Sequence, residues 1–219
     1  MSNEEAVKES YKEYDLPYYT RKEEILNIIS HGIGVPLTII VLAFLLVHSS
    51  NWLSVIASIT ACFSGMLVFG VSAIYHAQTN PKKKHFWRCI DHGDISFLCL
   101  GCGVPVALCV NTSIFSCLSV GVCLIICVVC ILLCQFNLKR YSTTCFILDF
   151  VIGFLIFLPI IINVAYIPLE TQILLFGGVG LCIIGSVLYT FNIKYIHTIF
   201  HVFTLVGPIM AFVGAYFVV

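Results

Sequence analysis

The sequence predicts an all-α integral membrane protein: a bundle of seven transmembrane helices with a cytoplasmic N-terminus and a C-terminus on the opposite side. Three observations support this prediction, namely the composition, the lengths of the apolar runs and the placement of the basic residues. Of the 219 residues, 60% are apolar and 10% are charged, and the mean hydropathy is +1.04. Because a soluble domain carries about 25% charged residues, soluble enzymes, disordered proteins and coiled coils are excluded.

Seven apolar runs are long enough to cross a bilayer, which takes about 20 helical residues. The runs are continuous rather than alternating, which is typical of helices and not of barrel strands. They form a transmembrane domain over residues 25–219, with helices at 28–47, 52–75, 91–110, 113–134, 144–164, 172–190 and 195–217.

Residues 1–24 precede the first run and form a polar tail with seven acidic and four basic residues. We expect this tail to be flexible and cytoplasmic. No cleavable signal peptide is visible, so the first helix is expected to act as its own signal anchor.

All eleven basic residues fall in the tail or in the loops that follow the second, fourth and sixth helices. They are Lys8, Lys12, Arg21, Lys22, Lys82, Lys83, Lys84, Arg88, Lys139, Arg140 and Lys194. With seven helices these segments share one face, which the positive-inside rule assigns to the cytoplasm. An even number of helices would scatter the basic residues over both faces.

The net charge is zero, so no basic field for nucleic acid exists. The expected partner is membrane lipid in a multi-pass protein. The sequence leaves open whether the membrane is the plasma membrane or an internal one, and it leaves the oligomeric state open.

Twelve cysteines raise the question of a metal or redox site. Cys99 and Cys102 form a CxxC motif in the third helix, and Cys127, Cys130 and Cys134 continue a similar spacing in the fourth. A zinc or redox site would require thiolates, whereas cysteine inside an apolar helix usually behaves as a small hydrophobic residue. We therefore expect reduced thiols.

Ionisable residues inside the membrane are costly and usually mark function. His76 ends the second helix, Asp91 opens the third, and His197 and His201 open the seventh. The predicted topology brings all four to the cytoplasmic end of the bundle. His197 and His201 are four residues apart, so they project from one helix face.

Three imidazoles from facing helices can act as ligands for zinc and leave a fourth position for water. Asp91 could orient or deprotonate that water, or bind the metal directly. Ser72 lies one turn before His76 and could form a hydrogen bond to the water, a ligand or a substrate. The alternative is that these histidines only pack at the membrane interface.

At these residues the chain resembles the hemolysin III-related family, within the superfamily of progestin and adipoQ receptors that includes the adiponectin receptors. Three elements carry the resemblance over nearly the whole membrane region. They are an opening motif from Glu24 through Asn27, Ser30 and His31, the pair Ser72-x3-His76 followed by Asp91-His92, and His197-x3-His201. The short loops are most similar to the bacterial hemolysin III branch.

The resemblance implies seven helices with an intracellular N-terminus and zinc held by His76, His197 and His201. It implies that Asp91 lies near the zinc-bound water and that Ser72 is the serine of the SxxxH motif. Many relatives carry another histidine ten residues after the HxxxH pair, where this chain has Ala211. That histidine is not among the zinc ligands that the resemblance implies. The difference at Ala211 therefore concerns the shape of the substrate or gating and leaves the metal site intact.

Three further polar residues each have two alternative roles. His31 is expected to cap or form a hydrogen bond at the start of the first helix, and touching substrate is the alternative. Asp94 is expected to cap or snorkel at the start of the third helix, with the cavity as the alternative. Asp149 is expected to form a hydrogen bond to a neighbouring helix, again with a cavity-lining role as the alternative.

The leading hypothesis is a zinc-dependent hydrolase of a membrane lipid, most plausibly a ceramide-like amide bound in an intramembrane cavity, with Asp91 as general base. The similarity of the family to alkaline ceramidases supports this choice. A second hypothesis is a seven-helix receptor or signalling protein with a structural zinc ion. A third is a cytolytic, hemolysin-type protein, ranked last because no polar stripe suited to a wide channel is visible.

Overall fold

The computed structural model describes residues 3–191 and 193–219, so residues 1, 2 and 192 of the predicted tail and domain lie outside it. Within these ranges the regular secondary structure is helical. The α-helices are α1 (Asn3–Glu13), α2 (Arg21–Gly32), α3 (Gly34–His48), α4 (Trp52–Ala77), α5 (Pro81–Gly93), α6 (Ile95–Cys109), α7 (Ile114–Ile162), α8 (Leu169–Tyr189) and α9 (Ile196–Gly214). Two short 3-10 helices, η1 (Val164–Tyr166) and η2 (Ala215–Phe217), complete the set.

Six of the described segments are long and apolar enough to cross a membrane: Arg21–His48, Trp52–Ala77, Pro81–Cys109, Ile114–Ile162, Leu169–Tyr189 and Ile196–Phe217. This finding confirms the predicted multi-pass helical membrane bundle. The fourth segment has 49 residues, about twice the number that a bilayer requires.

Helix α7 is a hairpin of two helices rather than one long rod. Asn137 interrupts it with the non-helical angles φ −164° and ψ 94°. The two halves run antiparallel, since the Sγ atoms of Cys134 and Cys145 lie 3.5 Å apart and Cys123 Sγ lies 3.9 Å from the carbonyl oxygen of Ile152. Counting the two halves separately, the described segments make the seven predicted passes.

The reversal at Asn137 is tighter than the sequence predicts. The expected boundaries left residues 135–143 as a loop, whereas the structure keeps helix on both sides of one residue. The Asn137 side chain accepts a hydrogen bond from the backbone N–H of Arg140 at 3.0 Å. It thereby caps the second half of the hairpin, which starts directly after the turn.

The first and third passes are each broken in the middle. Helices α2 and α3 meet at Ile33, and α5 and α6 meet at Asp94. Pro36 has no N–H and its ring collides with the carbonyl group four residues earlier, which accounts for the end of α2 at Gly32. The helices begin earlier than the predicted starts at about residues 28 and 91, because polar turns extend these passes back to Arg21 and Pro81.

Capping residues explain these earlier starts. Thr20 and Glu23 form a capping box at the start of α2. Asn80 caps α5 through the N–H of Lys83, with Pro81 in the first turn, where its missing N–H costs nothing. Consequently Asp91 lies near the end of α5 and does not open a helix.

The segment predicted as a flexible tail forms helix α1 and then packs on α5. His85 Nδ1 donates a hydrogen bond to the carbonyl oxygen of Tyr14 at 2.9 Å, and Arg88 donates to that of Asp15 at 2.5 Å. Tyr11 and Leu16 are buried. The tail is therefore docked against the membrane domain.

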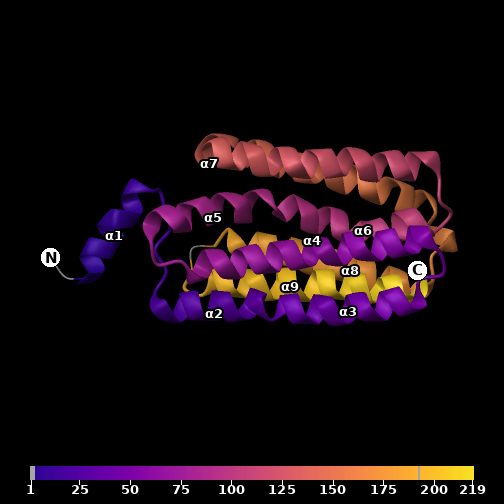
Figure 1. Ribbon diagram of the computed structural model, residues 1–219, viewed down its shortest axis with the longest axis horizontal. Coiled ribbons are helices and arrows are strands. Elements are labelled where there is room, and N and C mark those ends of the chain that lie inside the picture. The colour runs from indigo at the N-terminus through magenta and orange to yellow at the C-terminus, as the bar shows by residue number, and fades with distance from the viewer. Residues whose placement is uncertain (1–2, 192) are drawn as a thin grey trace.

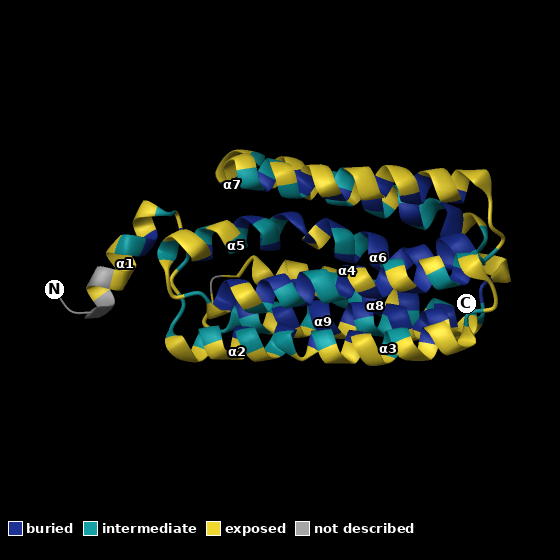
Figure 2. Ribbon diagram, in the orientation of Figure 1, coloured by how far each residue is buried: buried dark blue, intermediate teal, exposed yellow. Residues whose placement is uncertain are grey.

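The starts of α2 and α5 and the tip of the α7 hairpin lie at the α1 end of the bundle, and the C-terminus lies at the opposite end (Figure 1). The segments that carry the basic residues therefore share one end, as predicted. Buried residues face the centre of the bundle, while the outer faces are exposed (Figure 2). Many of these exposed residues are large and apolar, including Phe136 and Phe154 on α7, as expected for a surface that faces lipid.

Helices α8 and α9 pack with their backbones in near contact. A Cβ atom added to Gly178 would lie 2.3 Å from the carbonyl oxygen of Gly207, and one added to Gly207 would lie 2.4 Å from that of Gly178. Only glycine permits this approach at either position. The packing fixes the position of α9, which carries His197 and His201.

Candidate metal centre

Three histidines from two helices converge at the end of the bundle that is predicted to face the cytoplasm. His76 comes from the last turn of α4, and His197 and His201 come from the first two turns of α9. One nitrogen atom of each lies within 4.8 Å of the other two, and all three side chains are buried. The Nε2 atoms of His76 and His197 are 3.1 Å apart. The three imidazoles predicted from the sequence can therefore hold a metal ion.

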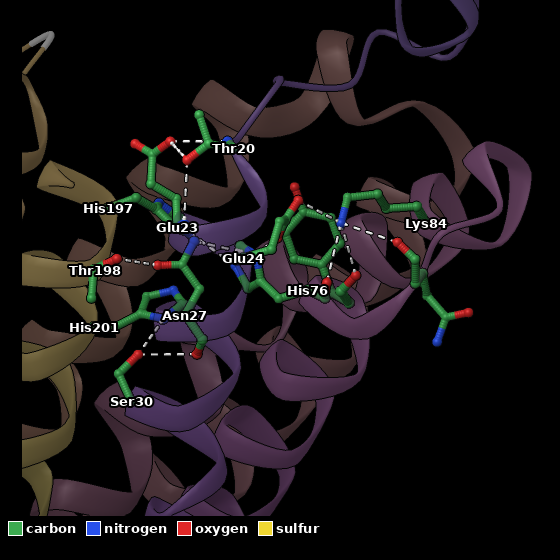
Figure 3. Close-up of polar contacts among 12 residues, drawn as sticks. Thr20, Glu23, Glu24, Asn27, Ser30, His76, Lys84, His197, Thr198 and His201 are labelled. Carbon is green, nitrogen blue, oxygen red and sulfur yellow. Dashed lines mark hydrogen bonds and ion pairs between the residues drawn. The ribbon is translucent and has the colours of Figure 1, made fainter. Parts of the chain in front are cut away.

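Helix α2 contacts two of these rings with polar side chains (Figure 3). Glu24 Oε2 lies 2.7 Å from Nδ1 of His76, and Ser30 Oγ lies 3.2 Å from Nδ1 of His201. Asn27, between them, accepts a hydrogen bond from Thr198 Oγ1 at 2.5 Å. These contacts join the first, second and last passes at one depth.

A buried lysine completes this network. Lys84 Nζ forms an ion pair with Glu24 Oε1 at 2.9 Å. It also donates hydrogen bonds to the carbonyl oxygens of Tyr75 and Gln78 at 3.3 Å and of His76 at 3.5 Å, at the C-terminal end of α4. A cation is favourable there because the last carbonyl groups of a helix carry partial negative charge.

His31 lies flat against His201, with ring centroids 3.7 Å apart and an angle of 8° between the planes. Its Nε2 lies 3.3 Å from Thr204 Oγ1. Of the two roles weighed for His31, the structure shows the hydrogen bond, although to α9 rather than to the end of its own helix.

Tyr19 covers the polar side of the cluster. Its ring stacks on His197 with centroids 5.1 Å apart at 26°. Partial burial, with the nearby Tyr189 and Glu24 as smaller causes, raises the pKa of Tyr19 well above its usual range. The phenol therefore remains a neutral hydroxyl group at physiological pH.

Asp91 lies beside the cluster but outside the group of three. Its carboxylate interacts electrostatically with His76, His31 and His197, and Oδ2 lies 3.6 Å from Nδ1 of His92. No carboxylate joins the group of ligand atoms within 4.8 Å in the described chain.

Several buried polar atoms near the cluster have no protein partner in the described chain. They include Ser72 Oγ, one turn before His76, and Nδ1 of His197, together with both carboxylate oxygens of Asp94. Asp94 makes no capping hydrogen bond, so its predicted capping role is wrong. A buried polar atom without a partner is costly, so these atoms point to water, an ion or a ligand.

A cavity of about 430 Å³ opens beside His197. Its walls come from the segment before α2, the start of α2, the end of α8 and the start of α9. Four tyrosines line it: Tyr18, Tyr19, Tyr189 and Tyr195. Of the cluster, His197 lines the cavity, together with Lys194, one of the basic residues.

The remaining predicted polar groups lie apart from the histidines. Asp149 accepts a hydrogen bond from Ser96 at 2.5 Å, which joins α7 to α6 as expected. All twelve cysteines are free, and Cys99 and Cys102 do not belong to the metal-binding group. Ala211 is buried within α9.

Sequence reasoning missed Lys84 and the roles of Glu24 and Ser30. Lys84 is one of three consecutive lysines, and nothing in the pattern distinguishes the one that turns inward. Glu24, Asn27, Ser30 and His31 did carry a signal, because intervals of three and four residues place them on one face of a helix.

Comparison with known proteins shows the family of the chain. The sequence profile of the family described as haemolysin-III related matches residues 19–212. A hemolysin-3 homolog of Bacillus subtilis (strain 168) is 32% identical over 204 residues, which cover 89% of this chain and 93% of the relative. Hemolysin-3 of Bacillus cereus is 29% identical over 205 residues, covering 87% and 89% of the two chains. The chain thus belongs to the haemolysin-III related family.

Proposed function

We propose that His76, His197 and His201 bind Zn²⁺ and that the protein hydrolyses an amide bond of a membrane lipid of the ceramide type. The observation that carries this proposal is the group of three buried imidazole nitrogens with Asp91 beside it rather than in it. Three protein ligands with an open fourth position are typical of catalytic zinc, whereas structural zinc has four protein ligands.

The donor set suits zinc in chemistry, and one of its nitrogen pairs suits zinc in spacing. Two nitrogens bound to one tetrahedral zinc ion at 2.0–2.1 Å lie about 3.3 Å apart, and the Nε2 atoms of His76 and His197 are 3.1 Å apart. Zinc bound there would supply an acidified water molecule and would polarise the scissile carbonyl group.

The remaining roles fall to side chains of this protein. Asp91 accepts the proton of the attacking water and returns it to the leaving nitrogen. Ser72, whose Oγ has no partner within residues 3–191 and 193–219, donates a hydrogen bond to the carbonyl oxygen of the substrate. One water is consumed and one C–N bond breaks, which yields a fatty acid and an amine.

The location of the site supports a lipid as the substrate. The histidines lie on segments that are long and apolar enough to cross a membrane. The cavity beside His197 combines aromatic rings with hydroxyl and amide groups. Glu23 and Lys194 also line it, so the lining suits a polar lipid head group, while the acyl chain remains among the apolar helices.

The test is zinc analysis of the protein purified in detergent, followed by mass spectrometry of a long-chain ceramide incubated with the same samples. Wild-type protein should contain close to one zinc per chain and release fatty acid. Asp91→Asn should keep the zinc and lose at least about 100-fold in rate, the usual contribution of a general base. Asp149→Asn is the matched control, since its carboxylate binds Ser96 and no histidine.

Two outcomes would redirect the proposal. Zinc present without turnover of any lipid tested, in wild-type protein and in both variants, would favour a receptor with structural zinc. Leakage of dye from liposomes that contain only the purified protein would favour a cytolytic protein.

A further inference from the structure

The polar face of α2 contacts the rings of His76 and His201 at their Nδ1 atoms. Glu24, Asn27, Ser30 and His31 lie on the side of α2 that faces α4 and α9, and Asn27 and His31 are buried. Each of these four side chains contacts a histidine of the cluster or a threonine of α9. The residues of the opening motif therefore contact the metal site in the folded protein.

We infer that Glu24 and Ser30 are positioning residues, which fix the protons of His76 and His201 on Nδ1 so that both Nε2 atoms are free to bind the metal. This inference rests on the proposed metal centre. A histidine that binds a metal usually donates its other ring N–H to a carboxylate or another oxygen, which sets its tautomer and orientation.

For His76 the assignment follows from the partner. Two groups lie near Nδ1 of His76, namely Glu24 Oε2 at 2.7 Å and, farther away, the amide nitrogen of Asn27 at 3.4 Å. The nearer group is a carboxylate, which can only accept hydrogen bonds. Nδ1 therefore carries the proton, and the lone pair is left on Nε2, the atom that lies 3.1 Å from Nε2 of His197. Lys84 Nζ lies 2.9 Å from the other oxygen of Glu24 and so holds the carboxylate in place.

For His201 the assignment follows from counting hydrogens. The single hydroxyl hydrogen of Ser30 goes to the carbonyl oxygen of Asn27 at 3.0 Å. Ser30 Oγ can therefore only accept from Nδ1 of His201, 3.2 Å away. This leaves the lone pair of His201 on Nε2, as for His76.

His31 holds the plane of the His201 ring by the same logic. Thr204 Oγ1 donates its hydrogen to the carbonyl oxygen of Phe200 at 2.9 Å, so His31 Nε2 donates to Thr204 Oγ1 at 3.3 Å. The His31 ring is thereby fixed against His201, with centroids 3.7 Å apart. His197 has no such support among the described residues, where its Nδ1 lacks a protein partner.

The experiment measures Zn²⁺ affinity of the full-length protein in detergent by competition with a chelator, alongside the visible spectrum of the Co²⁺-substituted protein. Glu24→Gln cannot accept from His76 and pair with Lys84 at once, and Ser30→Ala removes the acceptor for His201. Each variant should bind Zn²⁺ about 10–100-fold more weakly, the usual effect of losing such a partner, with an altered Co²⁺ spectrum.

Two further variants separate positioning from general stability. Ser30→Thr keeps the hydroxyl group and should restore the affinity that Ser30→Ala loses. Asp149→Asn alters a carboxylate on α7 that accepts a hydrogen bond from Ser96. It should lower thermal stability at most, with the affinity unchanged.

The outcomes are distinguishable. Wild-type zinc binding together with unchanged affinity and spectrum in Glu24→Gln and Ser30→Ala would overturn this inference and leave the metal centre standing. Should Glu24→Gln fail to fold, the comparison of Ser30→Ala with Ser30→Thr decides. Absence of zinc from folded wild-type protein would overturn the metal centre and this inference together.

Discussion

We expect Tyr19 to make the free energy of unfolding depend on pH in the alkaline range. Its pKa is raised in the folded state by burial and by the nearby Tyr189 and Glu24. Above pH 10 the unfolded chain loses this proton while the folded chain keeps it, so stability falls as pH rises, by at most about 1.4 kcal/mol per pH unit. Below pH 10 the contribution is constant.

The variant Tyr19→Phe isolates this effect. Thermal unfolding in detergent between pH 8 and pH 11 should show wild-type protein losing stability faster than Tyr19→Phe above pH 10, with parallel curves below it. Curves that stay parallel over the whole range would show that Tyr19 ionises as readily in the folded protein as in the unfolded chain.

At the level of single residues, the sequence predicts the histidines of the site but not all the side chains that contact them. His76, His197 and His201 are conspicuous because imidazoles are rare in apolar helices and because the topology places them at one end. Lys84 does not stand out from its neighbours in the sequence, since it follows Lys82 and Lys83 in a basic loop. Its inward position results from the C-terminal carbonyl groups of α4 and the carboxylate of Glu24, which come together only in the folded bundle.

Among the helices, the tightest contact joins α8 and α9 at Gly178 and Gly207. In Gly178→Ala the added methyl group would lie 2.3 Å from the carbonyl oxygen of Gly207, so the helices must separate. We expect a loss of about 1–3 kcal/mol in the free energy of unfolding, with weaker zinc binding because α9 carries two of the three histidines.

Gly180→Ala is the control for this substitution. A Cβ at Gly180 meets nothing within 4 Å, and alanine favours the helical backbone. Unfolding in detergent should show Gly180→Ala as stable as wild type or more so. Equal stability of the two alanine variants would contradict the close packing of α8 on α9.

The reversal of α7 at Asn137 can be tested by cross-linking. Cys134 and Cys145 lie in opposite halves with their Sγ atoms 3.5 Å apart. Copper phenanthroline, which oxidises thiol pairs, should join these two residues by a disulfide bond that peptide mass spectrometry detects and that Cys134→Ser abolishes. In a straight α7 the two residues would be about 16 Å apart, and no such peptide would form.

The breaks within passes are the part of the elements that the sequence predicted least well. Apolar runs show where lipid surrounds a helix, but they do not show polar turns that extend it or residues that interrupt it. Asp94 breaks the third pass without a proline or a side-chain cap at the junction. Such breaks depend on packing between helices, which periodicity along one helix does not contain.

For the molecule as a whole, charge placement predicts the orientation in the membrane. The variants Ser50→Cys, between α3 and α4, and Lys82→Cys, at the start of α5, place thiols at exposed positions beyond opposite ends of α4. A membrane-impermeant thiol reagent added to intact cells should label Ser50→Cys above the wild-type background. Lys82→Cys should be labelled only after permeabilisation, and the reverse pattern would invert the orientation.

The general architecture could be predicted because composition and chain length leave few choices in a bilayer. A chain with 10% charged residues must bury its backbone polar groups in helices, and the basic loops then orient the bundle. Whole-molecule geometry also brings the ends of α4, α5 and α9 together, so the approximate position of the site could be predicted. The exact contacts of the site could not be predicted, because they depend on the polar first turns of α2. The apolar pattern places the start of the first helix after these turns.

The most direct test of the metal centre is X-ray absorption at the zinc edge on wild-type protein purified in detergent, beside His197→Ala. We predict one zinc per chain with three imidazole nitrogens and one oxygen at about 2.0–2.1 Å, and loss of the bound zinc in His197→Ala. Protein that folds without zinc, or zinc surrounded by sulfur at about 2.3 Å, would contradict the assignment of the site to His76, His197 and His201.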